Sequence, residues 1–417
     1  MKVLVIGSGG REHAIIWAFK QAKKEIEIFC ANGNAGIAEL ATCVNIKPVE
    51  IEKLAEFAEK ESIDLTFVGG ETSLALGVVD EFEKRGLQII GVSKKTAQLE
   101  ASKAFAKDFM AFHKIPTAKY RVADSTEEAK ELLAEFDEKV VIKADGLAAG
   151  KGVVIAQNHE EAIKAIDELE SIVGDEAMKQ IVLEECLIGK EVSLLLFSDG
   201  KNFALMPPVR DHKRVGEGDT GANTGGMGTF SDDSLLNKSE LEKITEEIIK
   251  PTLEGCENDG FPLKGILFIG LMMTENGAKV LEYNVRFGDP ETQSIMVRLE
   301  TDFGEICQSI LDQTLDKLEI NWKKGSSACV VLAAENYPAK PKTGDRISGL
   351  ENISDAVVFH AGTVKDKDGN FVTAGGRVLG ITSYGENLNE TLNKAYSAAK
   401  QINWSGMHYR NDIGKTL

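Results

Sequence analysis

The stretch VVIKADGLAAGKGVVIA, residues 140–156, contains the pattern that decides the predicted fold. Two runs of β-branched residues flank a glycine-rich loop. Lys143 closes the first run, and Gly150 and Lys151 lie in the loop. The loop does not match G-x-x-x-x-G-K-[ST], and a strand follows it where a P-loop is followed by a helix. We therefore predict a flexible hairpin that closes over a polyphosphate, with Lys143 pointing inward. Taken alone, the loop leaves open a surface hairpin whose lysines reach into solvent.

A second polar cluster, LEYNVRFGDPETQ at 281–293, provides hard oxygen ligands. Glu282 and Asn284 stand two residues apart on an expected strand, so their side chains share one face. Carboxylate and amide oxygens on a rigid strand suit Mg²⁺, which also binds substrate phosphates. Arg286 lies on the same face and can fork onto a carboxylate or a phosphate, and Asp289 lies beyond it. This stripe of polar residues argues against the alternative, a solvated strand edge.

The segment RDHKRVGEGDTGANTGGMG, residues 210–228, is too rich in glycine and charge to belong to a core. We expect a long polar loop over 211–230. Its alternating charges, among them Asp211 and Lys213, indicate a loop that contacts substrate. A disordered linker is the alternative.

The segment GSGGRE, residues 7–12, follows an expected strand and opens an expected helix. Its amides at Gly9 and Gly10 are therefore suited to receive a phosphate. A dinucleotide fingerprint needs a further glycine where Glu12 stands, and an acidic residue after the second strand, where the sequence reads FCAN. We therefore favour a phosphate or sugar-phosphate site over a dinucleotide site, with a simple tight turn as the alternative.

Strand and helix patterns alternate over the first hundred residues, which predicts a parallel sheet with covering helices. Ligands of such sheets bind at the carboxyl ends of the strands, where GSGGRE, ANGNAG and GGETS lie. Further along, we expect a small α/β unit over 120–195, a hairpin over 265–288 and short strands from Ser326 onward. The expected helices cover 11–22, 48–61, 74–86, 96–113, 159–171, 239–254, 291–312 and 388–402.

The composition is that of a water-soluble globular protein: 43% of the 417 residues are hydrophobic and 27% are charged. The chain is too long for a single core. Its net charge of −18 disfavours nucleic-acid or anionic-membrane partners, so an anionic substrate must be held by a local group of cations. Six scattered cysteines form no C-x-x-C pair and are expected to be reduced and buried. Because no apolar run reaches ~18 residues and no signal peptide is present, we expect a cytoplasmic protein.

Five motifs in their order and spacing resemble the phosphoribosylamine–glycine ligase family of the ATP-grasp superfamily: SKAFAKDFMAFHKIPTA, VIKADGLAAGKG, VLEEC, HKRVGEGDTGANTGGMG and LEYNVRFGDPETQ. The resemblance spans essentially the whole chain. It implies an α/β fold with an N-terminal α/β domain over 1–101 and a mainly β C-terminal domain over 326–417. Between them it implies an ATP-grasp domain over 102–325, α+β in character, with two antiparallel sheets and a small mobile lid at about 120–192.

The resemblance also implies an ATP site between the two antiparallel sheets. Lys103 and Lys143 match phosphate-binding lysines, and Glu282 and Asn284 match ligands of Mg²⁺ or Mn²⁺. Gly270 or Leu271 stands where many ATP-grasp enzymes have a further glutamate, which argues against a fully acidic two-metal cage. The remaining implied ATP contacts are Gly150 and Lys151 in the loop, Glu184, Glu185 and the backbone near Leu187 at the adenine edge, and Glu191 at the ribose.

The implied reaction joins glycine to 5-phosphoribosylamine in de novo purine synthesis. ATP is the co-substrate, glycyl phosphate the intermediate, and a monomer the expected form. We expect Asp211 to hold the ammonium group of glycine and Arg286 its carboxylate. The ribosyl phosphate is expected near Gly9, Gly10 and Glu71, although GGETS replaces the family's GPEAP-like loop there. Further expected substrate contacts are Lys213, Thr224, Gly225 and Asp289.

Three rival interpretations remain. The first is another ATP-grasp carboxylate–amine ligase of purine synthesis that uses a different carboxylate, such as formate or bicarbonate. The second is a nicotinamide-dependent oxidoreductase, and the third a nucleotide-binding regulatory protein without catalysis. The 210–228 segment argues against the first, the missing third glycine against the second, and the retained lysine and metal positions against the third.

Overall fold

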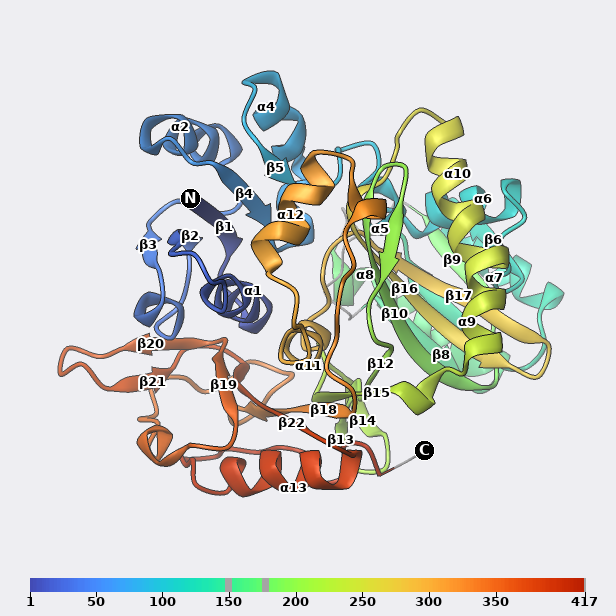
Figure 1. The fold of residues 1–417 in the computed structure, drawn as a ribbon. Coiled ribbons are helices and arrows are strands. Elements are labelled where there is room, and N and C mark those ends of the chain that lie inside the picture. The colour runs from blue at the N-terminus through green and yellow to red at the C-terminus, as the bar shows by residue number, and fades with distance from the viewer. Residues whose placement is uncertain (147–151, 175–179, 416–417) are drawn as a thin grey trace.

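A computed structural model of the chain describes residues 1–146, 152–174 and 180–415. The predicted fold class is confirmed: a parallel sheet at the N-terminus, two antiparallel sheets in the centre and a mainly β region at the C-terminus (Figure 1). Within the described residues, no helix combines the length and apolarity needed to cross a membrane. All six cysteines are unpaired, and the expectation that all are buried is wrong for Cys43, which is exposed, and for Cys186, which is half-buried.

The N-terminal region is a five-stranded parallel sheet in the order β3-β2-β1-β4-β5. Its central strand β1 has no exposed surface over Val3–Ile6, as expected when helices cover both faces of a parallel sheet. The strands are β1 (Lys2–Gly7), β2 (Glu27–Asn32), β3 (Thr42–Val44), β4 (Leu65–Val68) and β5 (Ile89–Ile90), and the helices are α1 (Gly10–Lys20), α2 (Ile51–Glu61), α3 (Glu71–Leu76) and α4 (Val78–Lys84).

Two helices that the sequence predicts as continuous are broken. The helix expected at 74–86 is divided into α3 and α4 by Gly77, whose φ of +92° suits glycine. The helix expected at 96–113 is divided into α5 (Gln98–Ala101) and α6 (Lys103–Phe112). At this break Ser102 is extended and its hydroxyl caps α6 by accepting from the amide of Phe105. The break places Lys103 in the first turn of α6.

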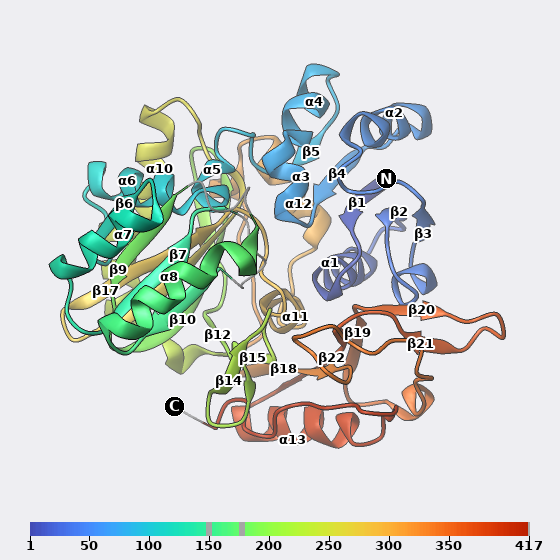
Figure 2. The ribbon, with the colours of Figure 1, turned by 180° about the vertical axis from the view of Figure 1, so that it is seen from behind.

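A four-stranded antiparallel sheet in the order β6-β9-β7-β8 forms a small unit that we call the lid (Figure 2). Its helices pack on one face and form a separate apolar core with the strands. The predicted hairpin of the 140–156 segment is present, with Lys143 paired to Val153. The lid contains β6 (Tyr120–Ala123), α7 (Thr126–Leu132), β7 (Val140–Ala144), β8 (Val153–Ala156), α8 (His159–Val173) and β9 (Ile181–Glu185).

A nine-stranded antiparallel sheet runs from the centre of the chain into the C-terminal region, in the order β17-β16-β10-β12-β15-β18-β22-β19, with β11 beside β10. Helix α13 (Leu388–Ala399) packs on β18 and β22 (Figure 1). The strands are β10 (Lys190–Asp199), β11 (Phe203–Leu205), β12 (Val209–Asp211), β15 (Gly228–Asp232), β16 (Lys264–Thr274), β17 (Gly277–Asn284), β18 (Ser326–Ala333), β19 (Val357–His360) and β22 (Arg377–Gly385).

The long loop expected over 211–230 is instead largely strand. Its two ends, β12 and β15, pair within the large sheet, where Asp211 lies opposite Thr229. Between them β13 (Arg214–Gly216) and β14 (Thr220–Asn223) form a separate hairpin. These strands are short and polar, so the apolar alternation that identifies a strand is absent from them.

Two more expected helices are interrupted. The one at 239–254 contains α9 (Lys238–Ile244), a π-helical turn at Thr245–Ile249 and α10 (Lys250–Asn258), with a proline in the first turn of α10. Proline lacks the N–H that a regular helix needs, which accounts for the irregular turn. The helix at 291–312 is divided into α11 (Glu291–Met296) and α12 (Phe303–Leu311).

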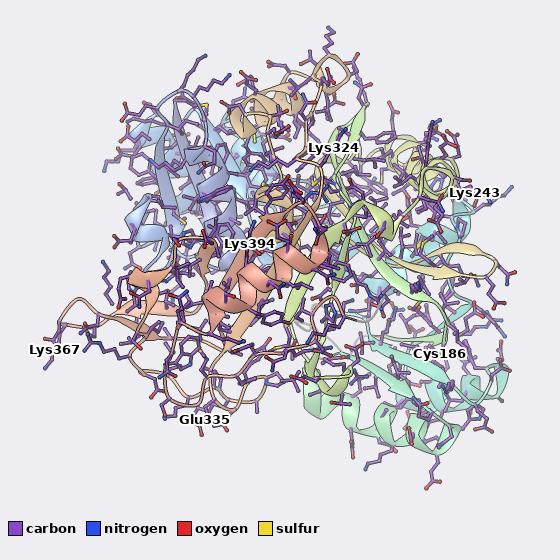
Figure 3. All side chains as sticks on the ribbon, turned by 60° about the horizontal axis from the view of Figure 1, so that its bottom comes forward. Cys186, Lys243, Lys324, Glu335, Lys367 and Lys394 are labelled. Carbon is purple, nitrogen blue, oxygen red and sulfur yellow. The ribbon has the colours of Figure 1, made fainter. Side chains whose placement is uncertain are left out.

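The second small hairpin, β20 (Thr363–Lys365) and β21 (Phe371–Thr373), projects from the C-terminal region with Lys367 at its tip (Figure 3). Cys186, which follows β9, lies on the opposite side of the molecule in the same view. The N-terminal, central and C-terminal regions meet between Lys367 and Cys186.

Candidate active site

A cavity lies between the lid, α6 and the end of β17, and it brings together five of the ten predicted nucleotide and metal residues. Its walls include Lys103, Lys143, Glu184, Glu282, Asn284, Arg286 and Glu71, together with the unpredicted Lys107 and Glu100. These residues come from segments far apart in the sequence.

The lid contributes a buried ionic triad to this cavity. Because side chains alternate along a strand, Ile142 and Leu183 pack in the lid core, whereas Lys143 and Glu184 face the cavity. One carboxylate oxygen of Glu184 lies 2.6 Å from the Lys143 ammonium and the other 2.8 Å from that of Lys107. Burial lowers the pKa of Lys107 to about 8, although Glu184 opposes this effect. One buried acid therefore serves two lysines.

Lys103 reaches the lid from α6. Its ammonium donates to the carbonyl of Gly146, 2.9 Å away, immediately before the part of the loop that holds Gly150 and Lys151. Those two residues lie outside the described part of the chain. Burial lowers the pKa of Lys103, while Glu282 favours its charged form. Two lysines from different elements thus face the same space.

Glu282 and Asn284 lie at the end of β17, after a bulge at Leu281 where the pairing with β16 shifts by one residue. The Lys213 ammonium, 3.5 Å away, is the main cause that lowers the pKa of Glu282 to about 2, against the effect of burial. The amide oxygen of Asn284 accepts from Arg286. Glu282 is therefore ionised at neutral pH.

These two side chains fit a magnesium ion that is shared with phosphates rather than one held by protein alone. Among the residues that the structure describes, no group of three or more His, Cys, Asp or Glu has the arrangement of a metal site. Mg²⁺ commonly takes one or two protein oxygens and completes its shell with water and substrate phosphates. The donor set of one carboxylate and one amide suits that mode.

Arg286 is held between two carboxylates. Its guanidinium lies 3.2 Å from Glu71 and 2.7 Å from Glu100, and Glu100 also accepts from the amide of Val285. Burial opposes ionisation of Glu71, but Arg286 and Arg11 outweigh it and lower the pKa of Glu71 overall. The arginine is thereby fixed at the rim of the cavity, and Glu71 is engaged by protein.

A second cavity lies where the N-terminal glycine loop meets the C-terminal region. Ser8, Gly9, Asn34, Asp289 and Arg377 are among its lining residues. The expectation that both glycine amides are open differs from the structure at Gly9, whose amide donates to Glu12 over 2.6 Å. Gly10 is buried, and an added Cβ there would lie 2.6 Å from the side-chain nitrogen of Gln293.

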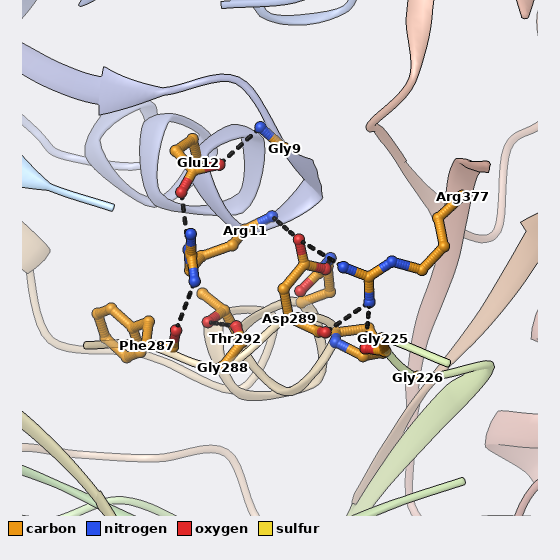
Figure 4. Close-up of polar contacts among 12 residues, drawn as sticks. Gly9, Arg11, Glu12, Gly225, Gly226, Phe287, Gly288, Asp289, Thr292 and Arg377 are labelled. Atoms are coloured by element: carbon orange, nitrogen blue, oxygen red, sulfur yellow. Dashed lines mark hydrogen bonds and ion pairs between the residues drawn. The ribbon is translucent and has the colours of Figure 1, made fainter. Parts of the chain in front are cut away.

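Asp289 joins three regions of the chain in this second cavity (Figure 4). Arg377 lies 3.3 Å from its carboxylate, and the amide of Arg11 donates to it. Burial opposes the charge of Asp289, but these arginines lower its pKa overall. Arg377 also donates to the carbonyl of Gly225, and the side chain of Arg11 donates to the carbonyl of Phe287. The N-terminal helix, the substrate segment and the C-terminal region therefore meet at one carboxylate.

Asp211 lies close to the contacts around Asp289. It approaches Gly226, where an added Cβ would lie 2.8 Å from its carboxylate, and Gly226 follows the Gly225 that Arg377 binds. Burial, followed by the nearby Glu291, raises the pKa of Asp211 well above its ordinary value. Thr224 is occupied by the backbone, because its hydroxyl donates to the carbonyl of Lys213. Asp211 and Glu291 form a pair of acids that a cation would stabilise.

The other predicted nucleotide contacts lie near the first cavity, which we call the nucleotide cavity after the residues predicted to line it. Glu185 is engaged by Lys279 and by the amide of Lys119. Leu187 lies in the connection between β9 and β10, and Glu191 lies on β10 with its carboxylate 3.8 Å from Lys213. Sequence reasoning missed Lys107, Glu100, Arg11 and Arg377, and it placed Glu291 beside Asp289 without giving it a role. Lys107, four residues after Lys103, is on the same helix face, which was the one available signal.

Two antiparallel sheets that enclose converging lysines beside a carboxylate and an amide oxygen are the arrangement of an ATP-grasp ligase. Family models for the phosphoribosylglycinamide synthetase N domain, ATP-grasp (A) domain and C domain match residues 1–100, 101–292 and 327–416. The chain belongs to this phosphoribosylglycinamide synthetase family, which confirms the resemblance seen in its motifs.

Individual relatives agree. The chain is 47% identical over 414 residues to the phosphoribosylamine–glycine ligase of Caldanaerobacter subterraneus subsp. tengcongensis, covering 99% of each chain. It is 48% identical to that of Vibrio vulnificus, over 99% of this chain and 98% of the relative. The crystal structure of phosphoribosylamine–glycine ligase from Thermotoga maritima is similar with a TM-score of 0.86 and 37% identity, covering 99% of this chain and 100% of that one. A biotin carboxylase domain from Hydrogenobacter thermophilus shares the fold at 17% identity and a TM-score of 0.72, covering 98% of this chain and 91% of that one.

Proposed function

We propose that this chain ligates glycine to 5-phosphoribosylamine with ATP, giving glycinamide ribonucleotide, ADP and phosphate in de novo purine synthesis. The observation that carries the proposal is the convergence of Lys103, Lys143 and Glu282 on one cavity beside Arg286. The family membership and the names of the relatives support it.

The chemistry explains why cations are needed. A carboxylate does not form an amide with an amine at neutral pH, because oxide is a poor leaving group. The carboxylate of glycine therefore attacks the γ-phosphorus of ATP and ADP leaves. The amine of phosphoribosylamine then attacks the carbonyl carbon of glycyl phosphate, phosphate leaves with one former glycine oxygen, and the nitrogen loses a proton.

The first step brings an anion to a polyanion. Two unit charges about 4 Å apart repel by about 4 kcal/mol at an effective dielectric constant of about 20. Lys103, Lys143 and Arg286 offset this repulsion and stabilise the charge that spreads over the transferring group. Holding the reactants in line removes a further ~7–11 kcal/mol of the barrier.

The nucleotide lies between the lid and β17. Lys103 and Lys143 hold its phosphates. The Glu184 side chain and the backbone at Glu185 and Leu187 meet the adenine edge, while Glu191 meets the ribose. The exposed position of Glu191 at the start of β10 supports the last assignment. Gly150 and Lys151 cover the phosphates, an assignment that rests on the resemblance alone.

Glu282 and Asn284 would hold Mg²⁺ or Mn²⁺. When bound, such an ion supplies positive charge to the phosphate oxygens. Lys213 keeps Glu282 ionised beside that position, which supports its role as a ligand.

Glycine binds with its ammonium group at Asp211 and its carboxylate at Arg286. The raised pKa of Asp211 supports this, because an acid that burial keeps from ionising gains most from an incoming cation. The phosphoribosyl group occupies the second cavity, which Gly9 and Asp289 line. Its further contacts are Gly10, Glu71, Lys213, Thr224 and Gly225. Arg377 supplies the positive charge there.

The enzyme acts in the cytoplasm as a monomer without nucleic-acid or membrane partners. Its net charge of −18 supports the absence of polyanionic partners. Its functional divisions are residues 1–101, 102–325 with the lid at about 120–192, and 326–417. The nearby boundaries of the family models support these divisions.

Release of ADP tests the proposal. The purified chain is assayed with glycine, formate or bicarbonate, each with and without phosphoribosylamine. We expect rapid release only with glycine and phosphoribosylamine together, and its loss in Lys143→Met. Equal release with formate or bicarbonate would assign the chain to a different carboxylate, and no release under any condition would refute catalysis.

A further inference from the structure

Arg410 is one of the most deeply buried charged residues, and its contacts lead to the substrate segment. Its side chain is 1% exposed. The guanidinium binds Asp412 with two hydrogen bonds of 2.8 and 2.7 Å, which fixes its plane. Its remaining nitrogen donates to the carbonyl of Arg214 at 3.0 Å and to the carboxylate of Asp219 at 2.7 Å. The last two acceptors belong to the β13–β14 hairpin, nearly 200 residues earlier in the chain.

The neighbours of Arg410 hold the same hairpin at other points. Asp412 accepts from the amide of Gly218 at 2.8 Å, and the side chain of Asn411 donates to Glu217 at 2.8 Å. The amide of Gly414 donates to the imidazole of His212 at 3.3 Å. Residues 410–414, which we call the clamp, therefore contact the base and the turn of the hairpin.

The hairpin has little to hold it apart from the clamp. Its strands contain three and four residues, and their pairing shifts between Arg214 and Gly216. An isolated two-stranded hairpin is at best marginally stable in water. The turn residues Gly218 and Asp219 both have positive φ, and residues 217–222 are exposed.

The position of the hairpin matters because its two ends lie in the proposed substrate site. Lys213, next to the Arg214 carbonyl that Arg410 binds, has its ammonium 3.5 Å from Glu282. At the other end, Gly225 accepts from Arg377 and donates to the hydroxyl of Tyr337. A change in the hairpin therefore displaces Lys213 and Gly225.

We propose that Arg410 is a positioning residue, which fixes the β13–β14 hairpin so that Lys213 and Gly225 face the bound substrates. This inference rests on the proposed ligase function. Among the described residues, Arg410 contacts no lining residue of the nucleotide cavity. Lys213 does approach Glu282 and Glu191, so we expect the loss of Arg410 to affect glycine and phosphoribosylamine more strongly than ATP.

Arg298 provides a matched control. Its side chain is also 1% exposed, and its guanidinium binds Ser231, Asp233 and the carbonyl of Lys323, all outside the hairpin. Arg298→Met and Arg410→Met each remove a buried arginine, and both are expected to destabilise the protein. Only the second removes contacts with the hairpin.

The experiment compares these variants by steady-state kinetics, by calorimetric binding of ATP and by hydrogen exchange of residues 213–224. In Arg410→Met we expect kcat/KM for glycine and phosphoribosylamine to fall by about 10- to 100-fold, the effect of a misplaced site. The dissociation constant for ATP changes by a smaller factor, and exchange is faster within the hairpin. Arg410→Lys keeps the positive charge but loses the guanidinium that binds Asp412 with two hydrogen bonds. We expect it to restore kcat/KM and hairpin exchange in part at most. Arg298→Met keeps wild-type KM values and hairpin exchange.

Asp219→Asn provides a milder test if Arg410→Met does not fold. It removes one ion pair at an exposed position, and asparagine tolerates the positive φ there. We expect the same pattern with a smaller shift. Wild-type kinetics and exchange in this variant, or the same changes in Arg298→Met as in Arg410→Met, would overturn the role of Arg410. Absence of glycine-dependent ADP release from the wild type would refute the ligase function instead, and hairpin exchange would still test the clamp.

Discussion

At the scale of single residues, Glu184 is a buried acid that Lys143 and Lys107 share, and it controls where the Lys143 side chain lies. In the structure Lys143 is paired with Glu184, and on our account it must turn to the phosphates of ATP. Glu184 is buried and needs a positive partner, because an unpaired buried charge is costly. Lys107 is that partner, since it lies 2.8 Å from the second oxygen of Glu184. We therefore expect Lys107 to free Lys143 when the nucleotide binds.

Replacing Lys107 with methionine should raise KM for ATP by about tenfold, because Glu184 then retains Lys143; a tenfold change corresponds to about 1.4 kcal/mol. The double variant Lys107→Met/Glu184→Gln should recover part of this loss. Initial-rate kinetics over a range of ATP concentrations measures both values. A double variant weaker than the single one would contradict the idea of a shared acid.

The same triad predicts a pH dependence. The pKa of Lys107 is lowered to about 8, so its charge is lost as the pH rises through that value. KM for ATP should therefore rise above about pH 8 in the wild type. Lys107→Arg keeps its charge and should show a flatter alkaline limb. Identical pH profiles for the two proteins would exclude Lys107 as the source.

At the scale of elements, regular patterns could be predicted and interruptions could not. The alternating strands and helices of the N-terminal region, the 140–156 hairpin and the Glu282–Asn284 strand end were all predictable from periodicity. The break at Ser102 was not, because the apolar spacing of α5 continues into α6. The short strands β12 and β15 were hidden by their glycine and charge. Partners such as Glu100, Arg11 and Arg377 come from distant segments, which a local pattern does not reveal.

The break at Ser102 has a measurable role. Its hydroxyl caps α6 and also donates to Asp145, 3.0 Å away, which links the helix of Lys103 to the lid. Ser102→Ala should lower the free energy of unfolding by about 1 kcal/mol, the usual value of a cap, and should raise KM for ATP. Urea titration and initial rates measure the two effects.

Ser125 supplies the control, since it caps α7 in the same way by accepting from the amide of Glu128. Within the described part of the chain, it contacts no residue that lines the nucleotide cavity. Ser125→Ala should cost similar stability and leave KM for ATP unchanged. An equal rise in KM for ATP in both variants would show that the cap of α6 affects the nucleotide site no more than the cap of α7 does.

At the scale of the whole molecule, the nine-stranded sheet joins the C-terminal region to the strands that support the site. Strands β15 and β18 pair over five residues from Gly228 to Asp232, so the substrate segment is continuous with the C-terminal strands. Asp289 and Arg377 join the same regions by an ion pair. The family divisions of the chain therefore do not correspond to separate sheets.

A chain that ends at residue 325 should not fold to a stable monomer, because β15 would become an unprotected edge with buried apolar neighbours exposed. Circular dichroism and size-exclusion chromatography of this truncated chain measure the outcome, with the full chain as reference. A monomer with native helix content that binds ATP would contradict this expectation.

The central claim is that glycine's carboxylate attacks the terminal phosphate of ATP at the lysines and Glu282. Its most direct test follows the carboxylate oxygens of glycine into the released phosphate. The enzyme is supplied with ATP, phosphoribosylamine and glycine labelled with ¹⁸O in both carboxylate oxygens, and the released phosphate is analysed by mass spectrometry. We predict one ¹⁸O atom in each phosphate released. Phosphate without ¹⁸O from a reaction that still forms the amide product would contradict the claim.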